Sequence, residues 1–224
     1  DYLPNIKAQQ EHWIGKSRGA FVNLSLKDIP EQLRIYTTRP DTLFGVTFMV
    51  IAPEHPIIDK YKDKIRNMDA IVDYRTECSK KTEFERTQLV KDKTGVKIDG
   101  LTAINPVNGR EIPVYISDYV MMGYGTGAIM AVPAHDDRDS DFAKQFGIDI
   151  LDVIKGGKID EAAYTGDGEM VNSDFLNGCD NKKDSIAKMI DFLQSKGIGE
   201  GGVQYKMKDW AFNRQRYWGE PFPV

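Results

Sequence analysis

The residues best suited to chemistry follow directly after an apolar run in the second half of the chain. This run, Ala128 to Val132, is typical of a buried strand and ends at Pro133, which lacks the backbone N–H that a strand ladder needs. The segment His135 to Asp139 then brings together one imidazole, one guanidinium and three carboxylates. Charged groups gathered at the end of a strand are typical of a pocket wall. We therefore expect one side of a ligand site here.

The chemistry of this segment has three interpretations. A metal site is disfavoured, because zinc usually takes three or four ligands and His135 is the only histidine here, while magnesium normally also needs substrate phosphates. An aspartate could hold a substrate ammonium through a charge-assisted hydrogen bond. Alternatively, Asp136 or Asp139 caps the next helix and Arg138 pairs with one of them. The sequence leaves the last two interpretations open.

A second candidate is the segment Thr37 to Thr42, which reads Thr-Thr-Arg-Pro-Asp-Thr. Its hydroxyls can donate or accept hydrogen bonds, and the planar guanidinium of Arg39 matches a phosphate or carboxylate. A simpler interpretation is a turn at a strand end, with Asp41 capping the backbone that follows.

The glycine-rich segment Gly123 to Gly127 is no phosphate loop, because it lacks the Gly-Lys-Ser/Thr ending and precedes a strand. No Gly-x-Ser-x-Gly motif or Cys–His pairing predicts a nucleophile.

The elements that must position these residues come in an irregular order. Apolar, β-prone runs predict strands, and helical spacing with a terminal glycine predicts helices that end before Gly147 and Gly197. A further helix is expected from Pro56 through Ile65, a charged helix or mobile segment over 75–92, and a loop over 156–168. Without regular strand–helix alternation, this order favours a β-rich barrel or mixed sheet with helices around it. The expected strands are 33–38, 46–52, 96–104, 111–120, 128–132 and 148–154, and the other expected helices are 139–146 and 182–196.

Composition narrows the classes of protein that the chain can represent. Its 224 residues are 41% hydrophobic and 29% charged, as in ordinary globular domains, and no apolar run approaches the ~20 residues that span a bilayer. The net charge of −4 argues that the chain does not bind long nucleic acid on its own, but it does not argue against recognition of a single nucleotide end. Cys78 and Cys179 match no metal spacing and are expected to be free thiols. With no signal segment in view, a cytoplasmic location is expected.

The two ends of the chain differ in character from the middle. Trp13 to Ser17 and Arg214 to Gly219 combine basic and aromatic residues without a core periodicity. They are either the junctions of a module inserted into a larger protein or two ordinary solvent-facing tails.

Together these segments resemble the editing domain of leucyl-tRNA synthetase, of the bacterial type. Thr37 to Thr42 is similar to the family's threonine-rich motif, Gly125 to Asp139 to its second block, and the two terminal segments to its junctions. The resemblance implies a closed β-barrel core of the Val/Ile/Leu-tRNA synthetase editing type, with peripheral helices. It also implies an N-terminal junction at 1–32, an editing domain at 33–204 and a C-terminal junction at 205–224.

The resemblance implies hydrolysis of the ester bond of misacylated tRNA(Leu), such as norvalyl-, isoleucyl- or methionyl-tRNA(Leu). A leucine-selecting pocket rejects a substrate that differs by one methylene by only ~1–3 kcal/mol, so a second sieve is needed. No aminoacylation is expected, because the chain lacks His-x-Gly-His and Lys-Met-Ser-Lys-Ser. The alternative is a module that binds an adenosine end with little hydrolysis.

The implied partners are the 3′-terminal adenosine of tRNA(Leu) carrying a wrong amino acid, and the rest of the synthetase in cis. AMP or adenosine–boron adducts are further expected ligands. We expect a monomer without membrane contact. Editing itself is expected to need no metal and no cofactor, since ATP and magnesium serve only the absent synthetic domain.

The resemblance also implies roles for single residues. Asp139 would bind the α-ammonium of the wrong amino acid, and Thr42 would be the gate that crowds a leucine side chain. Thr37 and Thr38 would hold the ester and the attacking water. Arg39 would face the phosphate or ribose, and Asp136 the ribose hydroxyls or the backbone. The remaining implied substrate-binding residues are the apolar wall of Met130 and Val132, the adenine platform of Val120, Met121 and Tyr124, and the polar residues Asp41, His135 and Arg138.

Overall fold

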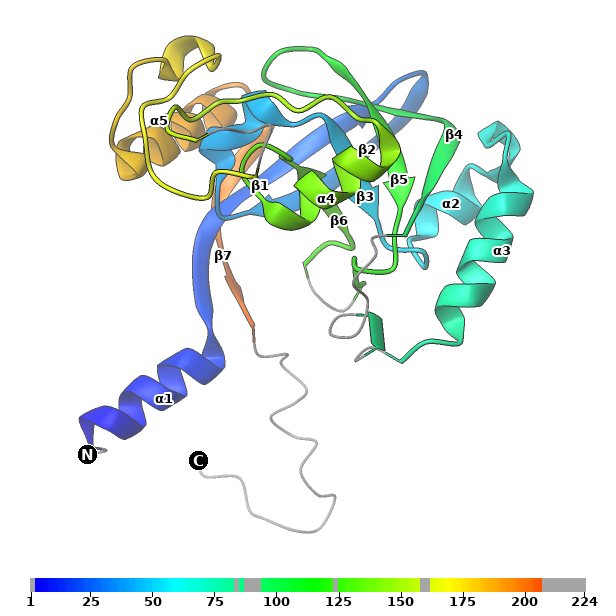
Figure 1. Ribbon diagram of the computed structural model, residues 1–224, viewed down its shortest axis with the longest axis horizontal. Coiled ribbons are helices and arrows are strands. Elements are labelled where there is room, and N and C mark those ends of the chain that lie inside the picture. Colours follow the sequence, from blue (N-terminus) through cyan, green and yellow to red (C-terminus); the bar gives the residue numbers. More distant parts are fainter. Residues whose placement is uncertain (1–2, 83–84, 87–93, 123–124, 158–161, 207–224) are drawn as a thin grey trace.

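A computed structural model describes residues 3–82, 85–86, 94–122, 125–157 and 162–206. Its centre is a seven-stranded mixed sheet in the order β2-β1-β4-β5-β3-β6, with β7 paired to β1 beside this path (Figure 1). The strands are β1 (Lys16–Leu26), β2 (Ile29–Thr37), β3 (Phe48–Ile51), β4 (Val96–Ile104), β5 (Glu111–Ile116), β6 (Ala128–Ala131) and β7 (Gly199–Tyr205). Five of them confirm the expected runs at 33–38, 46–52, 96–104, 111–120 and 128–132, with shifted ends.

The long strand β1 connects the parts of the sheet. It pairs antiparallel with β2 and β7, and its last residues, Ser25 and Leu26, pair with β4. Alternate side chains of β1 from Ala20 to Leu26 are buried, which is the period-2 pattern of a strand with one face in the core. This strand lies within the segment 1–32 that the sequence assigns to a junction. That domain boundary stays a prediction.

The closed barrel is not confirmed. β2 and β6 lie at the two ends of the strand order and next to each other in space. Within the described residues, no ladder of hydrogen bonds joins them, so the sheet curls without closing. The mixed sheet with surrounding helices, which was the other expected architecture, is therefore the one observed.

The helices surround this sheet as Figure 1 shows. α4 crosses in front of it, α5 lies at one side, α2 and α3 lie at the other, and α1 projects from the end of the β1–β7 ribbon. The α-helices are α1 (Pro4–Ile14), α2 (Pro56–Lys60), α3 (Met68–Ser79), α4 (Asp137–Phe146) and α5 (Lys182–Ser195). Short 3-10 helices are η1 (Pro40–Gly45), η2 (Lys62–Lys64) and η4 (Asp174–Leu176). No helix in these described parts is long and apolar enough to cross a membrane.

The expected helices at 139–146 and 182–196 are confirmed as α4 and α5. α4 ends at Gly147, whose φ of 63° is the left-handed conformation that glycine adopts readily. The helix expected from Pro56 through Ile65 is shorter in the structure: α2 ends at Lys60, Tyr61 has non-helical dihedral angles (φ −119°, ψ 27°), and the chain continues as η2. The charged segment expected at 75–92 overlaps the end of α3 and otherwise lies mostly outside the described residues.

The strand expected at 148–154 is wrong, apart from an isolated bridge between Ile154 and Met170. Val153 and Ile154 are buried as a strand would predict, so the apolar signal was correct about burial and wrong about conformation. The N–H of Val153 donates to the ring of His135 instead of to a neighbouring strand. Side-chain partners of this kind satisfy a buried backbone without a ladder.

An aromatic cluster fixes α4 on the sheet. Phe142 stacks on Phe48 with 5.1 Å between ring centroids, and it also contacts Tyr115 and Phe146. Burying a phenylalanine side chain contributes roughly 1.5–3 kcal/mol, so this cluster firmly sets the position of α4. The N-terminus of α4 is thereby held beside the end of β6, where the polar segment begins.

Candidate functional site

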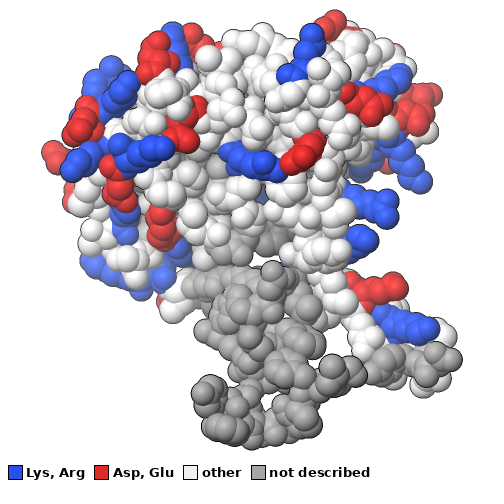
Figure 2. Space-filling view, turned by 180° about the vertical axis from the view of Figure 1, so that it is seen from behind, with Lys and Arg blue, Asp and Glu red and all other residues white. Residues whose placement is uncertain are grey.

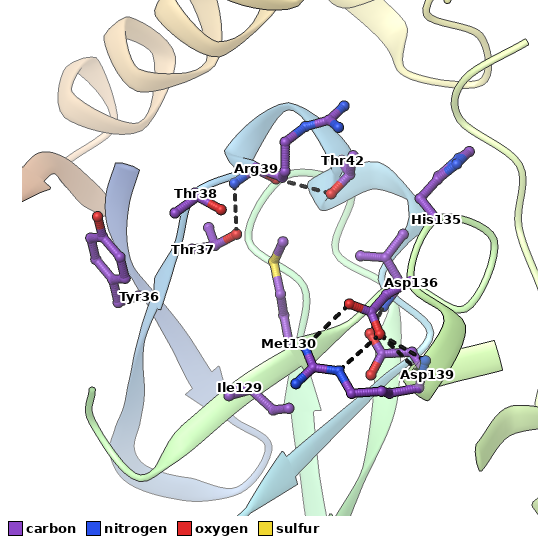
Figure 3. Close-up of a pocket in the computed structure, with 12 residues that line it drawn as sticks. Tyr36, Thr37, Thr38, Arg39, Thr42, Ile129, Met130, His135, Asp136 and Asp139 are labelled. Carbon is purple, nitrogen blue, oxygen red and sulfur yellow. Dashed lines mark hydrogen bonds and ion pairs between the residues drawn. The ribbon is translucent and has the colours of Figure 1, made fainter. Parts of the chain in front are cut away.

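A cavity of about 280 Å³ lies between the end of β2 and the end of β6. Figure 3 shows the threonine-rich turn on one side of it, Asp136 and Asp139 on the other, and Met130 between them. The two segments that the sequence singled out therefore meet in space, although almost 100 residues separate them. The lining residues are Tyr36, Thr37, Thr38, Arg39, Thr42, Ile129, Met130, Val132, His135, Asp136, Arg138 and Asp139.

The threonine-rich turn is held by its own side chains. The N–H of Arg39 donates to Thr37 Oγ1 at 3.0 Å, so the hydroxyl proton of Thr37 stays available for another partner. The Thr42 hydroxyl donates to the carbonyl oxygen of Arg39 at 2.9 Å. Thr42 is nearly fully buried in the cavity wall, with its hydroxyl held by the turn. Thr38 is exposed at the mouth.

Asp41 does not reach the cavity. Its side chain is fully buried, and its two oxygens accept hydrogen bonds from Arg39 Nε at 3.0 Å and Nη2 at 2.9 Å. Ser185 of α5 donates a longer hydrogen bond, of 3.4 Å, to the same carboxylate. A bidentate guanidinium–carboxylate pair fixes both groups in direction. Asp41 therefore orients Arg39, which lines the cavity, and does not itself face a ligand there.

The capping interpretation holds for Asp136. Its carboxylate accepts from the backbone N–H groups of Arg138 at 2.9 Å and Asp139 at 3.3 Å, which makes it the N-cap of α4. The guanidinium of Arg138 lies 3.3 Å from the same carboxylate. Both side chains still line the cavity, so capping and ligand contact do not exclude each other here.

Asp139 is the most perturbed carboxyl group of the site. Only 6% of the residue is exposed, and its Oδ2 accepts from the N–H of Val132 at 2.8 Å. The pKa of Asp139 is raised to about 7, mainly by burial and then by the charge of Asp136, against the opposing effects of the Val132 N–H and Arg138. A carboxyl group with such a pKa binds a proton below about pH 7. A cationic ligand group beside it would take the place of that proton.

His135 lies at the edge of the cavity, but both of its ring nitrogens are used by the backbone. Nε2 accepts from the N–H of Val153 at 3.1 Å, and Nδ1 lies 2.8 Å from the carbonyl oxygen of Tyr164. The Val153 N–H and the Tyr164 carbonyl oxygen fit a neutral ring with its proton on Nδ1, and Asp152 Oδ1 lies 3.3 Å from Nε2 as well. Burial lowers the pKa of His135, which favours the same form. His135 therefore ties the loop of Val153 and Tyr164 to the pocket.

The apolar part of the wall includes both predicted residues and two that the sequence did not indicate. Met130 and Val132 line the cavity as expected, and Tyr36 and Ile129 join them. Tyr36 directly precedes the threonine-rich motif, and its hydroxyl donates to the carbonyl oxygen of Ser17 at 2.8 Å. Its place one residue before the motif was the available signal.

The expected adenine platform is not part of this cavity. Val120 is buried in the aromatic cluster, Met121 is half-buried, and neither lines the cavity. Tyr124 lies outside the described residues. No group of three or more His, Cys, Asp or Glu residues in the described ranges is arranged to hold a metal ion.

Comparisons with known proteins identify the family of this chain. The family model described as "Leucyl-tRNA synthetase, editing domain" matches residues 11–194. A leucine–tRNA ligase from Alkaliphilus oremlandii is 56% identical over 226 aligned positions, which cover all of this chain and 28% of that protein. This chain thus spans little more than a quarter of the relative's length.

A solved structure shares the fold as well. It is described as the crystal structure of the ternary complex of Agrobacterium radiobacter K84 agnB2 LeuRS-tRNA-LeuAMS. The match has a TM-score of 0.69 and 29% sequence identity, and it covers 92% of this chain and 22% of that one. With a family model that matches most of its length, the chain belongs to the family of leucyl-tRNA synthetase editing domains.

Proposed function

We propose that this chain hydrolyses the ester bond between a wrong amino acid and the 3′-terminal adenosine of tRNA(Leu). One observation carries the proposal: the threonine-rich turn and the buried Asp139 line a single cavity of about 280 Å³. This volume is at the lower end of small-ligand pockets, which span roughly 300–1,000 Å³. It suits an aminoacyl group with part of its ribose, and the adenine would then lie outside it.

In this proposal Asp139 binds the α-ammonium of the wrong amino acid. The carboxylate is held in place by the Val132 N–H and is almost fully shielded from water, so a charge-assisted hydrogen bond to an ammonium is strengthened. Binding one end of the substrate there directs the ester carbonyl towards Thr37 and Thr38 across the cavity. Asp139 thus positions the reacting bond.

The hydroxyls of Thr37 and Thr38 would act on the ester and the water. Thr37 Oγ1 already accepts from the N–H of Arg39, so its own proton is free to donate to the negative charge that develops on the carbonyl oxygen. Thr38, at the exposed mouth, would hold the attacking water. No metal or cofactor enters this step, and we expect hydrolysis to continue in the presence of a chelator.

Thr42 would form the size limit of the pocket together with Met130 and Val132. Because the Thr42 hydroxyl is bound to the Arg39 carbonyl, the gate is held in one rotamer by the turn. A fixed methyl group at the wall excludes a leucine side chain and admits smaller or differently shaped ones. The discrimination expected from one such group is ~1–3 kcal/mol.

The rest of the synthetase would supply most of the binding affinity for tRNA. The net charge of this chain is −4, and Figure 2 shows acidic and basic side chains interspersed on one face, without a broad basic patch. A domain of this kind can recognise a nucleotide end, whereas long nucleic acid usually requires a basic surface. We therefore propose that the chain works in cis within a leucyl-tRNA synthetase, on the terminal adenosine that carries the error.

The test is deacylation of isoleucyl- and norvalyl-tRNA(Leu) by this chain, with and without a chelator. The Asp139→Ala variant should lose hydrolysis, whereas Asp137→Ala, which removes an exposed carboxylate in the same helical turn, should retain it. Normal clearance by the Asp139→Ala variant would contradict the assigned role.

The alternative is an adenosine-end binding module with little hydrolysis, which the net charge favours. Titration with AMP beside the turnover assay separates the two functions. AMP binding without turnover at any accessible substrate concentration would support the binding module, and turnover would exclude it.

A further inference from the structure

Arg86 is a buried cation outside the cavity, and its side chain organises a segment of the backbone. Only 8% of the residue is exposed. Its Nε donates to the carbonyl oxygen of Asp118 at 2.8 Å, and its Nη2 donates to that of Val120 at 3.2 Å. Nη1 pairs with Glu54 at 2.8 Å. One guanidinium thus binds the carbonyls on both sides of Tyr119.

Two more residues from the α3 side hold the same segment. The ammonium of Lys81 lies 2.7 Å from the buried carboxylate of Asp118, and the Tyr74 hydroxyl accepts from the N–H of Asp118 at 3.1 Å. These contacts fix the first residue of the segment. Arg86 alone among these three reaches past Tyr119 to Val120. A backbone turn also spans Tyr119, in which the Val120 N–H donates to the carbonyl oxygen of Ser117 at 3.4 Å, so this turn and Arg86 together set the path of the backbone through Tyr119.

Tyr119 connects this segment to the helix that carries Asp139. Its ring packs edge-on against Phe142 of α4, with 6.2 Å between centroids. Phe142 follows Asp139 by three residues, so the two side chains lie on the same face of α4, and the hydroxyl oxygen of Tyr119 is buried beside this face. The charge of Asp139 also raises the pKa of Tyr119, after the larger effect of burial. The charged and titratable groups of the described residues that face Asp139 are Asp136, the N-cap of α4, Arg138 from α4 and Tyr119 from the loop after β5.

We propose that Arg86 is a positioning residue for Asp139: it fixes Tyr119 against α4, and Tyr119 in turn keeps water away from the Asp139 carboxyl group. The functional part of this inference rests on the proposed binding of an ammonium by Asp139. A shielded carboxylate gives the strong, oriented contact that this binding needs, and a hydrated one would hold the ammonium more loosely.

Loss of the Arg86 side chain should shift the pKa of Asp139 in a definite direction. Removing a positive charge by itself raises the pKa of a nearby carboxyl group, whereas admitting water to a buried one lowers it. If Arg86 acts by packing, its loss must lower the pKa of Asp139 from about 7 towards the ordinary 3.8. A shift of at least one pH unit, which is about tenfold in proton affinity, is expected.

The experiment is a ¹³C NMR titration of the Asp139 carboxyl group in the aspartate-labelled chain, with assignment by Asp139→Asn. The variants are Arg86→Met and Arg86→Lys. Lysine keeps the cation near Glu54 but cannot bind both carbonyls in the geometry of a guanidinium. The control is Arg75→Met, which removes an arginine from α3 whose partner is Asp59 and for which no hydrogen bond to the segment 118–120 is seen.

Both Arg86 variants should lower the Asp139 midpoint, and Arg75→Met should leave it unchanged. An unchanged or raised midpoint in either folded Arg86 variant would overturn the proposal, and the lysine variant keeps the test available if the methionine variant does not fold. A parallel pH profile of deacylation should show its acid limb moving down by the same amount. Because the titration needs no turnover, an inactive wild-type chain would reject the proposed function without affecting the result for Arg86.

Discussion

Replacing Asp139 by asparagine should make the chain more stable relative to the wild type as the pH rises. The pKa of the carboxyl group is raised to about 7 in the folded state by burial, whereas its ordinary value is 3.8. Between these two values the folded state holds a proton that the unfolded state has lost. The free energy of unfolding contributed by this group is therefore fully present below pH 3.8 and is lost as the pH rises through 7.

The size of the effect follows from the pKa difference. At about 1.4 kcal/mol per unit, the shift from 3.8 to about 7 amounts to about 4 kcal/mol, of which about 3 kcal/mol falls between pH 5 and pH 8. Asparagine can still accept from the Val132 N–H through its Oδ1 and has nothing to ionise. Any fixed penalty of the new amide is the same at every pH, so the change with pH isolates the carboxyl group.

Urea unfolding of the wild type and the Asp139→Asn variant at several pH values between 5 and 8 measures this change. Asp137→Asn serves as the control, because it removes an exposed carboxylate from the same turn of α4. We expect the stability of Asp139→Asn relative to the wild type to increase by about 3 kcal/mol over this range, while deacylation is lost. A difference that stays constant with pH would refute the inference that the folded chain holds Asp139 protonated.

Three further changes test other parts of the site. Thr42→Ala should raise the rate at which leucyl-tRNA(Leu) is hydrolysed by roughly tenfold or more, because the cavity wall loses a methyl group. Deacylation of correctly charged tRNA measures this rate, and an unchanged rate would show that Thr42 is not the gate. Gly19→Ala should slow hydrolysis of misacylated tRNA, because a Cβ at Gly19 would overlap the carbonyl oxygen of Thr37, whereas in the control Gly201→Ala the new Cβ meets only the side chain of Ile190 at 3.3 Å. Equal rates of hydrolysis in the two variants would contradict this role of Gly19. His135→Phe should lower the free energy of unfolding by about 2 kcal/mol, because the Val153 N–H and the Tyr164 carbonyl lose their partners. Chemical denaturation measures this loss, and a variant as stable as the wild type would show that the His135 ring does not hold the loop.

The parts of the site that could be predicted from the sequence are those in which several polar side chains lie close together along the chain. Thr37 to Thr42 and His135 to Asp139 each place several polar side chains within six residues, and each lies at a strand end in the structure. Their meeting in one cavity depends on the pairing of strands distant in sequence, which no local pattern specifies. The resemblance to a family supplied that long-range information.

Side-chain direction was the part that the sequence could not give. Asp41 and His135 have the residue types of ligand-binding groups, yet one is enclosed by Arg39 and Ser185 and the other is used by the backbone of a loop. β7 was not expected, because a glycine-rich segment such as Gly199–Tyr205 has little intrinsic strand propensity. Its pairing with β1 supplies the structure that its own residues do not favour.

The open seam of the sheet is the reason that a cavity can exist in this place. Strands joined by a ladder lie only about 4.8 Å apart, which leaves no room for a ligand between them. The lining residues Tyr36 and Thr37 belong to β2, and Ile129 and Met130 belong to β6, so the cavity lies where a closed barrel would have joined these two strands. Closing the barrel by adding hydrogen bonds at this seam would remove the space in which the wrong amino acid is proposed to bind. The departure from the expected closed barrel and the presence of this cavity therefore have one structural cause.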